Sequence, residues 1–210
     1  MKLVCTSDTH MGHHALGVPE ADVLIHAGDF TRRGSRAEAT GFLDWLAWQP
    51  ATHKLLIAGN HDLCCEQDSA WFANEAAERA VVLLLDSEVV IDGVRFWGSP
   101  MTPRFRNMAF NRERGTEIRA HWDKIPHGVD VLITHGPPRG IGDRMFLGAH
   151  VGCDDLRERV AEIQPAVHVF GHIHEAFGEH ADPGKKTRFL NVACARFLSY
   201  GRRNAVELDV

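Results

Sequence analysis

The chain has 210 residues, of which 44% are hydrophobic and 24% are charged, and its formal net charge is −5. This length and composition are typical of one globular domain with a sizeable core, so we expect a single domain over residues 1–210. The negative net charge disfavours a protein that follows a nucleic-acid backbone, because such domains are usually basic. The longest fully apolar run, residues 80–85, is too short to span a membrane.

The amino terminus turns polar after five residues and lacks the apolar stretch of a signal peptide. The five cysteines are an odd number and lack the paired CxxC spacing of a zinc site. Together these features predict a cytoplasmic protein with reduced, mostly buried thiols.

Short apolar runs that favour strands alternate along the chain with segments that favour helices. The first helix is expected to begin with the capping box of Ser35 and Glu38, and the last to be capped by Asp154. Asp92-Gly93 predicts a hairpin turn. In chain order we expect strands at 2–6, 22–27, 54–58, 88–91, 94–98, 129–134, 166–170, 188–192 and 205–210, and helices at 36–46, 68–80 and 154–163. Near-continuous apolar strands suit sheets covered on both faces, so we predict an α/β sandwich of two mixed sheets with outer helices.

Five polar clusters each follow one of the expected strands. In open α/β sheets ligands bind beyond the carboxyl ends of the strands, so these clusters mark one candidate site. Residues two apart in extended backbone project to the same side, and Asp8 and His10 are therefore expected to reach one ion, as are His172 and His174. The clusters are Asp8-Thr9-His10, Gly28-Asp29, Gly59-Asn60-His61-Asp62, Thr134-His135-Gly136 and Gly171-His172-Ile173-His174.

The side chains in these clusters are ligand types for divalent metal ions. Carboxylate, amide and imidazole ligands without thiolate suit Mn²⁺, Fe or Zn²⁺, and we expect two ions with Mn²⁺ as the first choice. Two ions about 3.5–4 Å apart clamp the attacking and leaving oxygens of an in-line displacement at phosphorus. They also lower the pKa of bound water to about 7.

The order of the motifs DxH, GD, GNHD, THG and GHxH over residues 8–174 resembles the calcineurin-like metallophosphoesterase superfamily. Residues 97–100, 134–138 and 168–175 resemble its metallophosphoesterase domain-containing (MPPED) branch, whose members are small phosphodiesterases acting on cyclic nucleotides. The resemblance implies a four-layer α/β/β/α sandwich. It also implies a first metal held by Asp8, His10 and His174, a second held by Asn60, His135 and His172, and Asp29 bridging both.

The same resemblance implies that His61 donates a proton to the leaving group and that Asp62 orients its ring; the alternative is a surface histidine. Many members of the superfamily use an arginine at the position of Arg33 near the phosphate, but a solvated loop arginine is equally compatible with the sequence. Arg104 and Phe105 suit a phosphate and a stacked base. Their alternative is a solvated basic loop in which Phe105 and Phe110 pack inward.

The leading interpretation is a phosphodiesterase that hydrolyses 2′,3′- or 3′,5′-cyclic nucleotides by in-line attack of a metal-bridging hydroxide. A phosphomonoesterase or a broad-specificity phosphodiesterase is the alternative enzyme, and a non-catalytic binding scaffold is the alternative of another class. The expected partner is a small phosphoester, with neither a membrane nor a nucleic acid.

Overall fold

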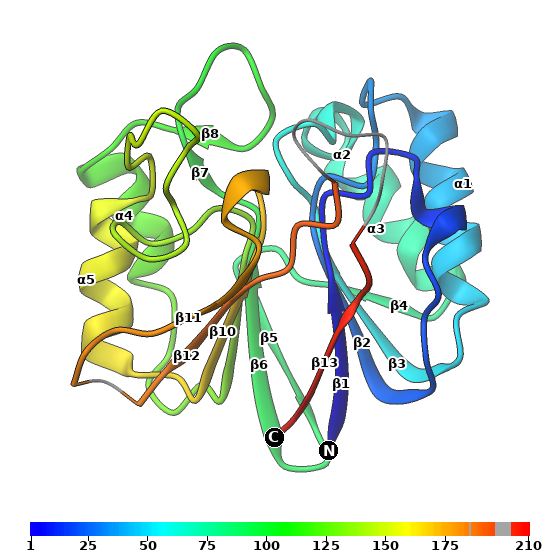
Figure 1. Ribbon diagram of the computed structural model, residues 1–210. Helices are drawn as coiled ribbons and strands as arrows, with labels where there is room; N and C mark the ends of the chain where they lie inside the picture. The colour runs from blue at the N-terminus through cyan, green and yellow to red at the C-terminus, as the bar shows by residue number, and fades with distance from the viewer. Residues whose placement is uncertain (185, 196–202) are drawn as a thin grey trace.

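Two β-sheets face each other at the centre of the computed structural model, which describes residues 1–184, 186–195 and 203–210 (Figure 1). The first sheet has the order β13-β1-β2-β3-β4 and the second the order β11-β12-β10-β9-β6-β5. The first consists of β1 (Lys2–Thr6), β2 (Ala21–Ala27), β3 (Ala51–Ile57), β4 (Val81–Leu83) and β13 (Val206–Asp209). The second consists of β5 (Ser87–Ile91), β6 (Val94–Ser99), β9 (Val131–Thr134), β10 (Val167–Phe170), β11 (Gly178–His180) and β12 (Arg188–Asn191).

Helices cover the outer faces of both sheets, so the molecule has four layers (Figure 1). The helices α1 (Arg36–Ala47), α2 (Leu63–Gln67) and α3 (Ser69–Glu78) lie on the first sheet, and α4 (Thr116–Trp122) and α5 (Asp154–Ile163) lie on the second. Smaller elements are η1 (His13–Ala15), η2 (His174–Ala176) and the two-stranded ribbon of β7 (Thr102–Pro103) and β8 (Asn111–Arg112). The fold class is therefore the predicted α/β/β/α sandwich of two mixed sheets.

Alternation along the strands builds two hydrophobic layers. Leu3 and Cys5 of β1 point between the sheets, whereas Val4 between them points to the helices. Each buried side chain of this size contributes about 1.5–3 kcal/mol on transfer from water. Because both faces of these strands are covered, they read as continuous apolar runs.

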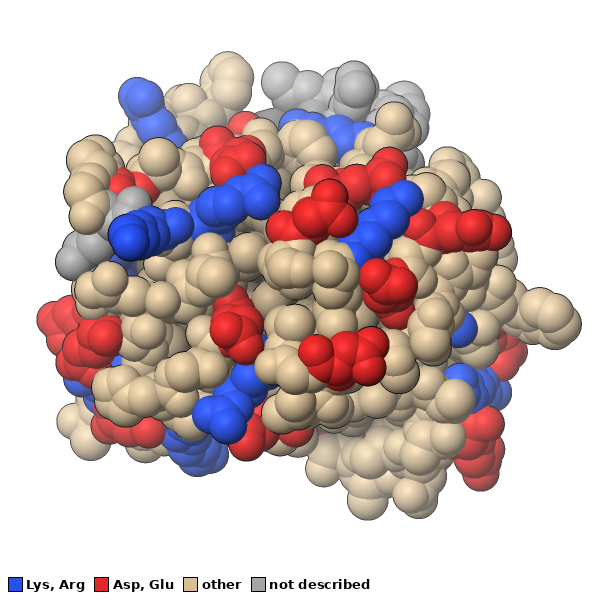
Figure 2. Space-filling view, turned by 90° about the horizontal axis from the view of Figure 1, so that it is seen from below, with Lys and Arg blue, Asp and Glu red and all other residues tan. Residues whose placement is uncertain are grey.

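The two sheets are joined at the edge where the parallel strands end. Ser7, after β1, pairs with Ala193, after β12, through backbone bonds of 3.1 Å to the Val192 carbonyl and 2.9 Å from the Cys194 amide. Both chain termini lie at the opposite end, where acidic and basic side chains are interspersed over the surface (Figures 1 and 2). The polar clusters therefore meet at one edge, away from the termini.

Local capping explains where the helices begin. Ser35 accepts a hydrogen bond from the amide of Glu38, whose side chain returns the bond, as predicted. The cap of α5 differs from the prediction, since Cys153 and not Asp154 accepts a bond from the Leu156 amide. The short strand β4 and the helices α2 and α4 were not predicted. Among the described residues, no helix combines the length and apolar character needed to cross a membrane.

Candidate metal centre

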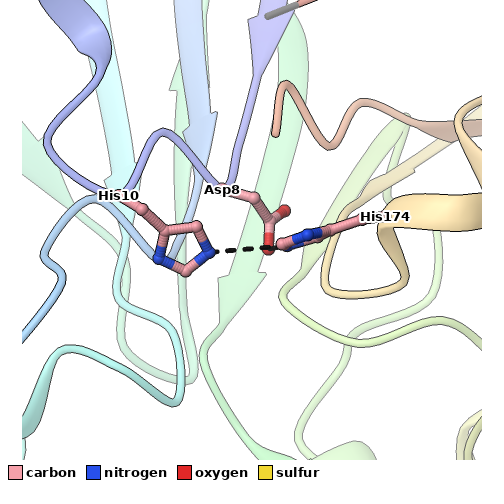
Figure 3. A group of neighbouring side chains, drawn as sticks. All are labelled: Asp8, His10 and His174. Carbon is pink, nitrogen blue, oxygen red and sulfur yellow. Dashed lines mark hydrogen bonds and ion pairs between the residues drawn. The ribbon is translucent and has the colours of Figure 1, made fainter. Parts of the chain in front are cut away.

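Asp8, His10 and His174 form the first group of converging side chains, and they come from the ends of β1 and β10 (Figure 3). The Nε2 atom of His174 lies 3.3 Å from Asp8 Oδ1 and 3.4 Å from His10 Nε2. The carboxylate of Asp8 is fully buried, and its second oxygen accepts hydrogen bonds from Ser7 Oγ and, at 2.9 Å, from the His172 amide. The structure therefore brings together the three residues expected for one ion.

Asp29, Asn60, His135 and His172 form the second group. His135 Nε2 lies 2.9 Å from Asn60 Oδ1 and 3.4 Å from Asp29 Oδ2. The rings of His135 and His172 meet edge to face with 5.0 Å between their centroids, and a nitrogen of His172 lies within 4.8 Å of ligand atoms of Asp29 and His135. These residues come from four separate segments of both sheets.

Asp29 belongs to the second group and also lies beside His10 of the first. Its Oδ2 atom lies 3.9 Å from His10 Nε2 on one side and 3.4 Å from His135 Nε2 on the other. Its Oδ1 atom accepts a hydrogen bond of 2.7 Å from the His61 amide. The carboxylate is thus fixed between His10 and His135, one residue from each group.

Backbone carbonyls set the orientation of two of the imidazoles. His10 Nδ1 lies 3.1 Å from the Thr31 carbonyl, and His135 Nδ1 lies 2.9 Å from the Ala27 carbonyl. A carbonyl only accepts, so each Nδ1 carries a proton, and the Nε2 atom of each ring points into the site. Metal-binding histidines are typically held in this way.

The donor set fits cations. If the His135 ring were neutral, its Nε2 would direct a lone pair at Asn60 Oδ1 and Asp29 Oδ2, an arrangement that is unfavourable without a positive charge between them. Burial alone would lower the pKa of His135, but the Asp29 carboxylate raises it to about 10. A proton on His135 then supplies the positive charge that a bound metal ion would otherwise supply.

The remaining pKa shifts have the same electrostatic origin. Burial alone would raise the pKa of Asp8, but the neighbouring His174 and the other site imidazoles lower it well below its usual range. Burial lowers the pKa of His172 to about 4, so this ring is neutral and keeps a lone pair. Anionic carboxylates and a neutral imidazole are the ligand forms that divalent ions require.

The backbone of the expected ligands is strained. Asp8, His10, Asp29 and His172 have φ angles of 53°, 41°, 59° and 68°, in the left-handed region that non-glycine residues rarely adopt. The expectation that Asp8 and His10 converge through extended backbone is therefore wrong, although both side chains reach the same group. The extended-backbone argument also fails for His172 and His174, which turn to different groups.

Two glycines allow the segments to approach this closely. A Cβ atom on Gly59 would overlap the Asp29 carboxylate and lie 2.7 Å from the His135 ring. A Cβ atom on Gly171 would overlap Ser7 Oγ and Asp8 Oδ2. The glycines of the GNHD and GHxH motifs are thus needed for packing against the ligands.

His61 lies beside the first group without belonging to its predicted ligands. Its ring meets that of His10 edge to face, with 4.7 Å between the centroids, and its Nδ1 lies 3.5 Å from the Arg32 carbonyl. A ring nitrogen of His61 is also within 4.8 Å of ligand atoms of His10 and Asp29. His61 is therefore placed beside the metal centre.

Asp62 acts on the backbone, in contrast to the expected contact with the His61 ring. One carboxylate oxygen accepts bonds from the amide and hydroxyl of Thr31, at 2.9 and 2.7 Å. The other accepts bonds from the amides of Asp29 and Gly59, at 3.0 and 2.8 Å. Burial, together with the Asp29 carboxylate, raises the pKa of Asp62 to about 7. Asp62 thus ties the GD segment to the GNHD segment.

The predicted substrate residues lie in two loops. Arg33 is exposed in the turn after Asp29, and its amide donates a hydrogen bond of 2.8 Å to Glu38. Arg104 is paired with Glu113, and the Phe105 side chain is 56% exposed. The alternative in which both phenylalanines pack inward is therefore wrong for Phe105, although Phe110 is buried as that alternative expected.

Several supporting residues were not identified from the sequence. Ser7 and Thr31 bond to the carboxylates of Asp8 and Asp62. The amide of Ala109 donates a bond of 3.0 Å to the Asn60 carbonyl. Thr31 and Ala109 meet their partners through long-range contacts that no sequence pattern connects, whereas Ser7 adjoins its partner in the chain.

Comparison with known proteins agrees with this geometry. The sequence model of the calcineurin-like phosphoesterase family matches residues 1–176. The UPF0046 protein K07C11.7 of Caenorhabditis elegans is 40% identical over 205 residues, which cover 92% of this chain and 69% of that protein. Human metallophosphoesterase domain-containing protein 1 is 40% identical over 204 residues, which cover 86% of this chain and 63% of that protein.

The chain therefore spans 63–69% of the length of these two relatives. The crystal structure of the phosphopantetheinyl hydrolase of Mycobacterium tuberculosis superposes with a TM-score of 0.67 at 18% identity, covering 98% of this chain and 95% of that chain. At this identity the likeness establishes the fold alone. The sequence matches confirm the resemblance seen in the motifs, and the chain belongs to the calcineurin-like phosphoesterase family of metal-dependent phosphoester hydrolases.

Proposed function

We propose that the protein is a two-metal phosphodiesterase that hydrolyses 2′,3′- or 3′,5′-cyclic nucleotides. The observation that carries the two-metal assignment is the position of Asp29 Oδ2 between His10 Nε2, at 3.9 Å, and His135 Nε2, at 3.4 Å. A carboxylate shared by two imidazole groups suits a bridging ligand. The family membership supports phosphoester hydrolysis as the reaction.

The proposed ligands are Asp8, His10 and His174 for one ion and Asn60, His135 and His172 for the other, with Asp29 common to both. When bound, the two ions, with Mn²⁺ ahead of Fe or Zn²⁺, would supply an activated water and neutralise charge on the phosphate. The protein contributes rigid ligand positions, because the carboxylates of Asp8 and Asp29 are buried and one oxygen of each accepts a hydrogen bond from a backbone amide.

We assign His61 as the proton donor to the leaving oxygen. Its Nδ1 faces the Arg32 carbonyl at 3.5 Å, and because a carbonyl only accepts, Nδ1 is the donor of this contact. Its main chain is fixed by the bond from its amide to Asp29, so the ring stays beside the metal centre. Asp62 supports this arrangement through the backbone of the two segments and not through the ring.

The loop between β7 and β8 supports a nucleotide as the substrate. Asn111 closes this loop by donating bonds of 3.1 and 2.9 Å to the carbonyls of Phe105 and Arg106. The loop thereby presents an exposed aromatic ring with a guanidinium beside it, which suits a stacked base. Arg33 and Arg104 are the further candidates for contacts with the phosphate or ribose, although the pairing of Arg104 with Glu113 must first be released.

The substrate is proposed to be a small soluble phosphoester. All five cysteines are buried, and buried thiols suit the expected reducing, cytoplasmic setting.

A substrate panel tests the proposal. The metal-free protein is reconstituted with Mn²⁺ and assayed against both classes of cyclic nucleotide, nucleoside monophosphates, bis(p-nitrophenyl) phosphate and p-nitrophenyl phosphate. Cyclic nucleotides should have the highest kcat/KM, and Asp29→Asn should abolish turnover. Preference for monophosphates would instead support a phosphomonoesterase, and absence of turnover with any ester and metal would support a binding scaffold.

Two variants test the residue roles. His61→Ala should lose about 10²–10⁴-fold in kcat on a cyclic nucleotide but much less on the activated aryl ester, whose leaving group needs no proton. Phe105→Ala should raise KM for the nucleotide and leave the aryl ester unaffected. Phe146→Ala is the matched control, because Phe146 is also an exposed phenylalanine, at 70%, on another loop.

A further inference from the structure

Two histidines outside the metal groups are fully buried beside the ligand-bearing segments. His26 lies in β2, next to β1, and His168 lies in β10, next to β9. Both occupy the helix-facing side of their sheets, where His26 packs on Phe42 and His168 lies between Phe170 and Phe189. Burial lowers the pKa of each to about 3, so both rings are neutral.

His26 connects two of the metal-ligand segments. The amide of Gly28 donates a bond of 3.3 Å to His26 Nδ1, so the ring proton is on Nε2. His26 Nε2 lies 3.2 Å from the hydroxyl of Thr9, which stands between the expected ligands Asp8 and His10. One imidazole thus links the DxH segment to the residue preceding Asp29.

His168 has the corresponding role in the second sheet. The hydroxyl of Thr134 donates a bond of 2.7 Å to the Gly136 carbonyl, so it must accept from His168 Nε2, at 2.8 Å. Thr134 and Gly136 flank the expected ligand His135. The bond from His168 therefore holds the turn that aims the His135 ring.

The burial of the His168 imidazole has a free-energy cost that packing alone does not explain. Among the described residues, His168 Nδ1 has no hydrogen-bond partner although it is buried. An unpaired buried polar atom is unfavourable, and an aromatic hydrocarbon ring would fill the space between Phe170 and Phe189 without it. The bond that Nε2 donates to Thr134 is what the imidazole adds.

We propose that His26 and His168 are positioning residues that hold the metal ligands through Thr9 and Thr134, and that they thereby set the affinity of the two cation sites. Each pair acts on one group: His26 and Thr9 on the group of Asp8 and His10, and His168 and Thr134 on the group of His135. The inference rests on the proposed two-metal site.

Calorimetric titration of the metal-free protein with Mn²⁺ tests this assignment. Thr9→Val and Thr134→Val remove the hydroxyls with little change of shape, and each should weaken one of the two binding steps by about 10- to 100-fold. Thr102→Val is the matched control, because Thr102 is also buried but its hydroxyl has no hydrogen-bond partner among the described residues. The control should bind Mn²⁺ as the wild type does.

The thermal stability of the metal-free variants separates positioning from a general structural role. A positioning role predicts weaker binding in variants whose melting temperature without metal stays close to that of Thr102→Val. His168→Phe should weaken the same Mn²⁺-binding step as Thr134→Val. The double variant should bind Mn²⁺ no more weakly than either single variant, because both substitutions remove the same hydrogen bond.

Unchanged dissociation constants in Thr9→Val and Thr134→Val, with two ions still bound by the wild type, would overturn the inference alone. An equal weakening in Thr102→Val would also overturn it. A wild-type protein that binds fewer than two Mn²⁺ ions would instead overturn the proposed function on which the inference rests.

Discussion

Gly171→Ala is the substitution for which the structure makes the sharpest prediction. Gly171 begins the GHxH motif, and its backbone does not need a positive φ, so alanine is permitted by conformation alone. The added Cβ would nevertheless overlap Ser7 Oγ and Asp8 Oδ2 and would lie 2.9 Å from Ser7 Cβ. The substitution therefore tests close packing against a metal ligand, separately from backbone strain.

The size of the effect follows from the contacts that must open. The Asp8 carboxylate has to move by about 1 Å, a displacement that costs about 100-fold in rate when it misplaces a catalytic group. The move breaks the bond from Ser7 and strains the bond of 2.9 Å from the His172 amide. Overpacking of this kind lowers the free energy of unfolding by about 1–3 kcal/mol.

The assay combines three measurements on purified protein: the free energy of unfolding in urea, the dissociation constants for Mn²⁺, and kcat on an aryl phosphodiester. Gly171→Ala should impair all three. Gly41→Ala is the control, because Gly41 lies within α1 and a Cβ there meets nothing within 4 Å. That control should gain about 0.5–1 kcal/mol of stability and keep full activity.

The reasoning would be refuted if Gly171→Ala bound Mn²⁺ with the wild-type constants and retained wild-type kcat. Such a result would mean that the strand ends can separate without displacing Asp8. A loss of stability alone, with metal affinity intact, would also contradict the link between this glycine and the ligand.

Three further predictions concern stability. Burial alone would raise the pKa of Asp86, but hydrogen bonds from Lys124 and His121 lower it below its value in the unfolded chain. The contribution of Asp86 to folding stability is therefore present above the unfolded pKa of about 3.9 and is lost as the pH falls below that value. Asp86→Asn, which tolerates the φ of 50°, should therefore flatten the decline of melting temperature below about pH 4, and an unchanged acid profile would contradict this. Ser35→Ala removes the cap of α1 and should cost about 1 kcal/mol in urea unfolding, whereas no loss would mean that the cap bond is not formed in solution. Removal of metal by EDTA should lower the melting temperature by about 5–10 °C, with recovery when Mn²⁺ reaches about 100 times its dissociation constant; a scan insensitive to both would argue against a bound metal.

The sequence was most informative where the determining interactions are local. The capping box at Ser35 and the strand ends before Asp8, Asp29 and His135 were predicted because each depends on neighbours within a few residues. Strand boundaries moved by one to three residues, as at β3, which begins at Ala51. The short strand β4 was missed because it forms only by pairing with β3.

The sequence by itself determined which chemical groups stand at the strand ends, and therefore the metal-dependent reaction class. The motif resemblance also implied which ion each group would serve, but only the tertiary structure brings the groups together. Asp29 lies between two histidines from different sheets, and His172 and His174 turn apart although they are two residues apart in the chain. The tertiary structure also decided that Asp62 accepts hydrogen bonds from backbone amides and that His26 and His168 are hydrogen bonded to threonines beside the ligands. Residue type and spacing reflect local geometry, whereas these contacts join segments that are distant in the chain.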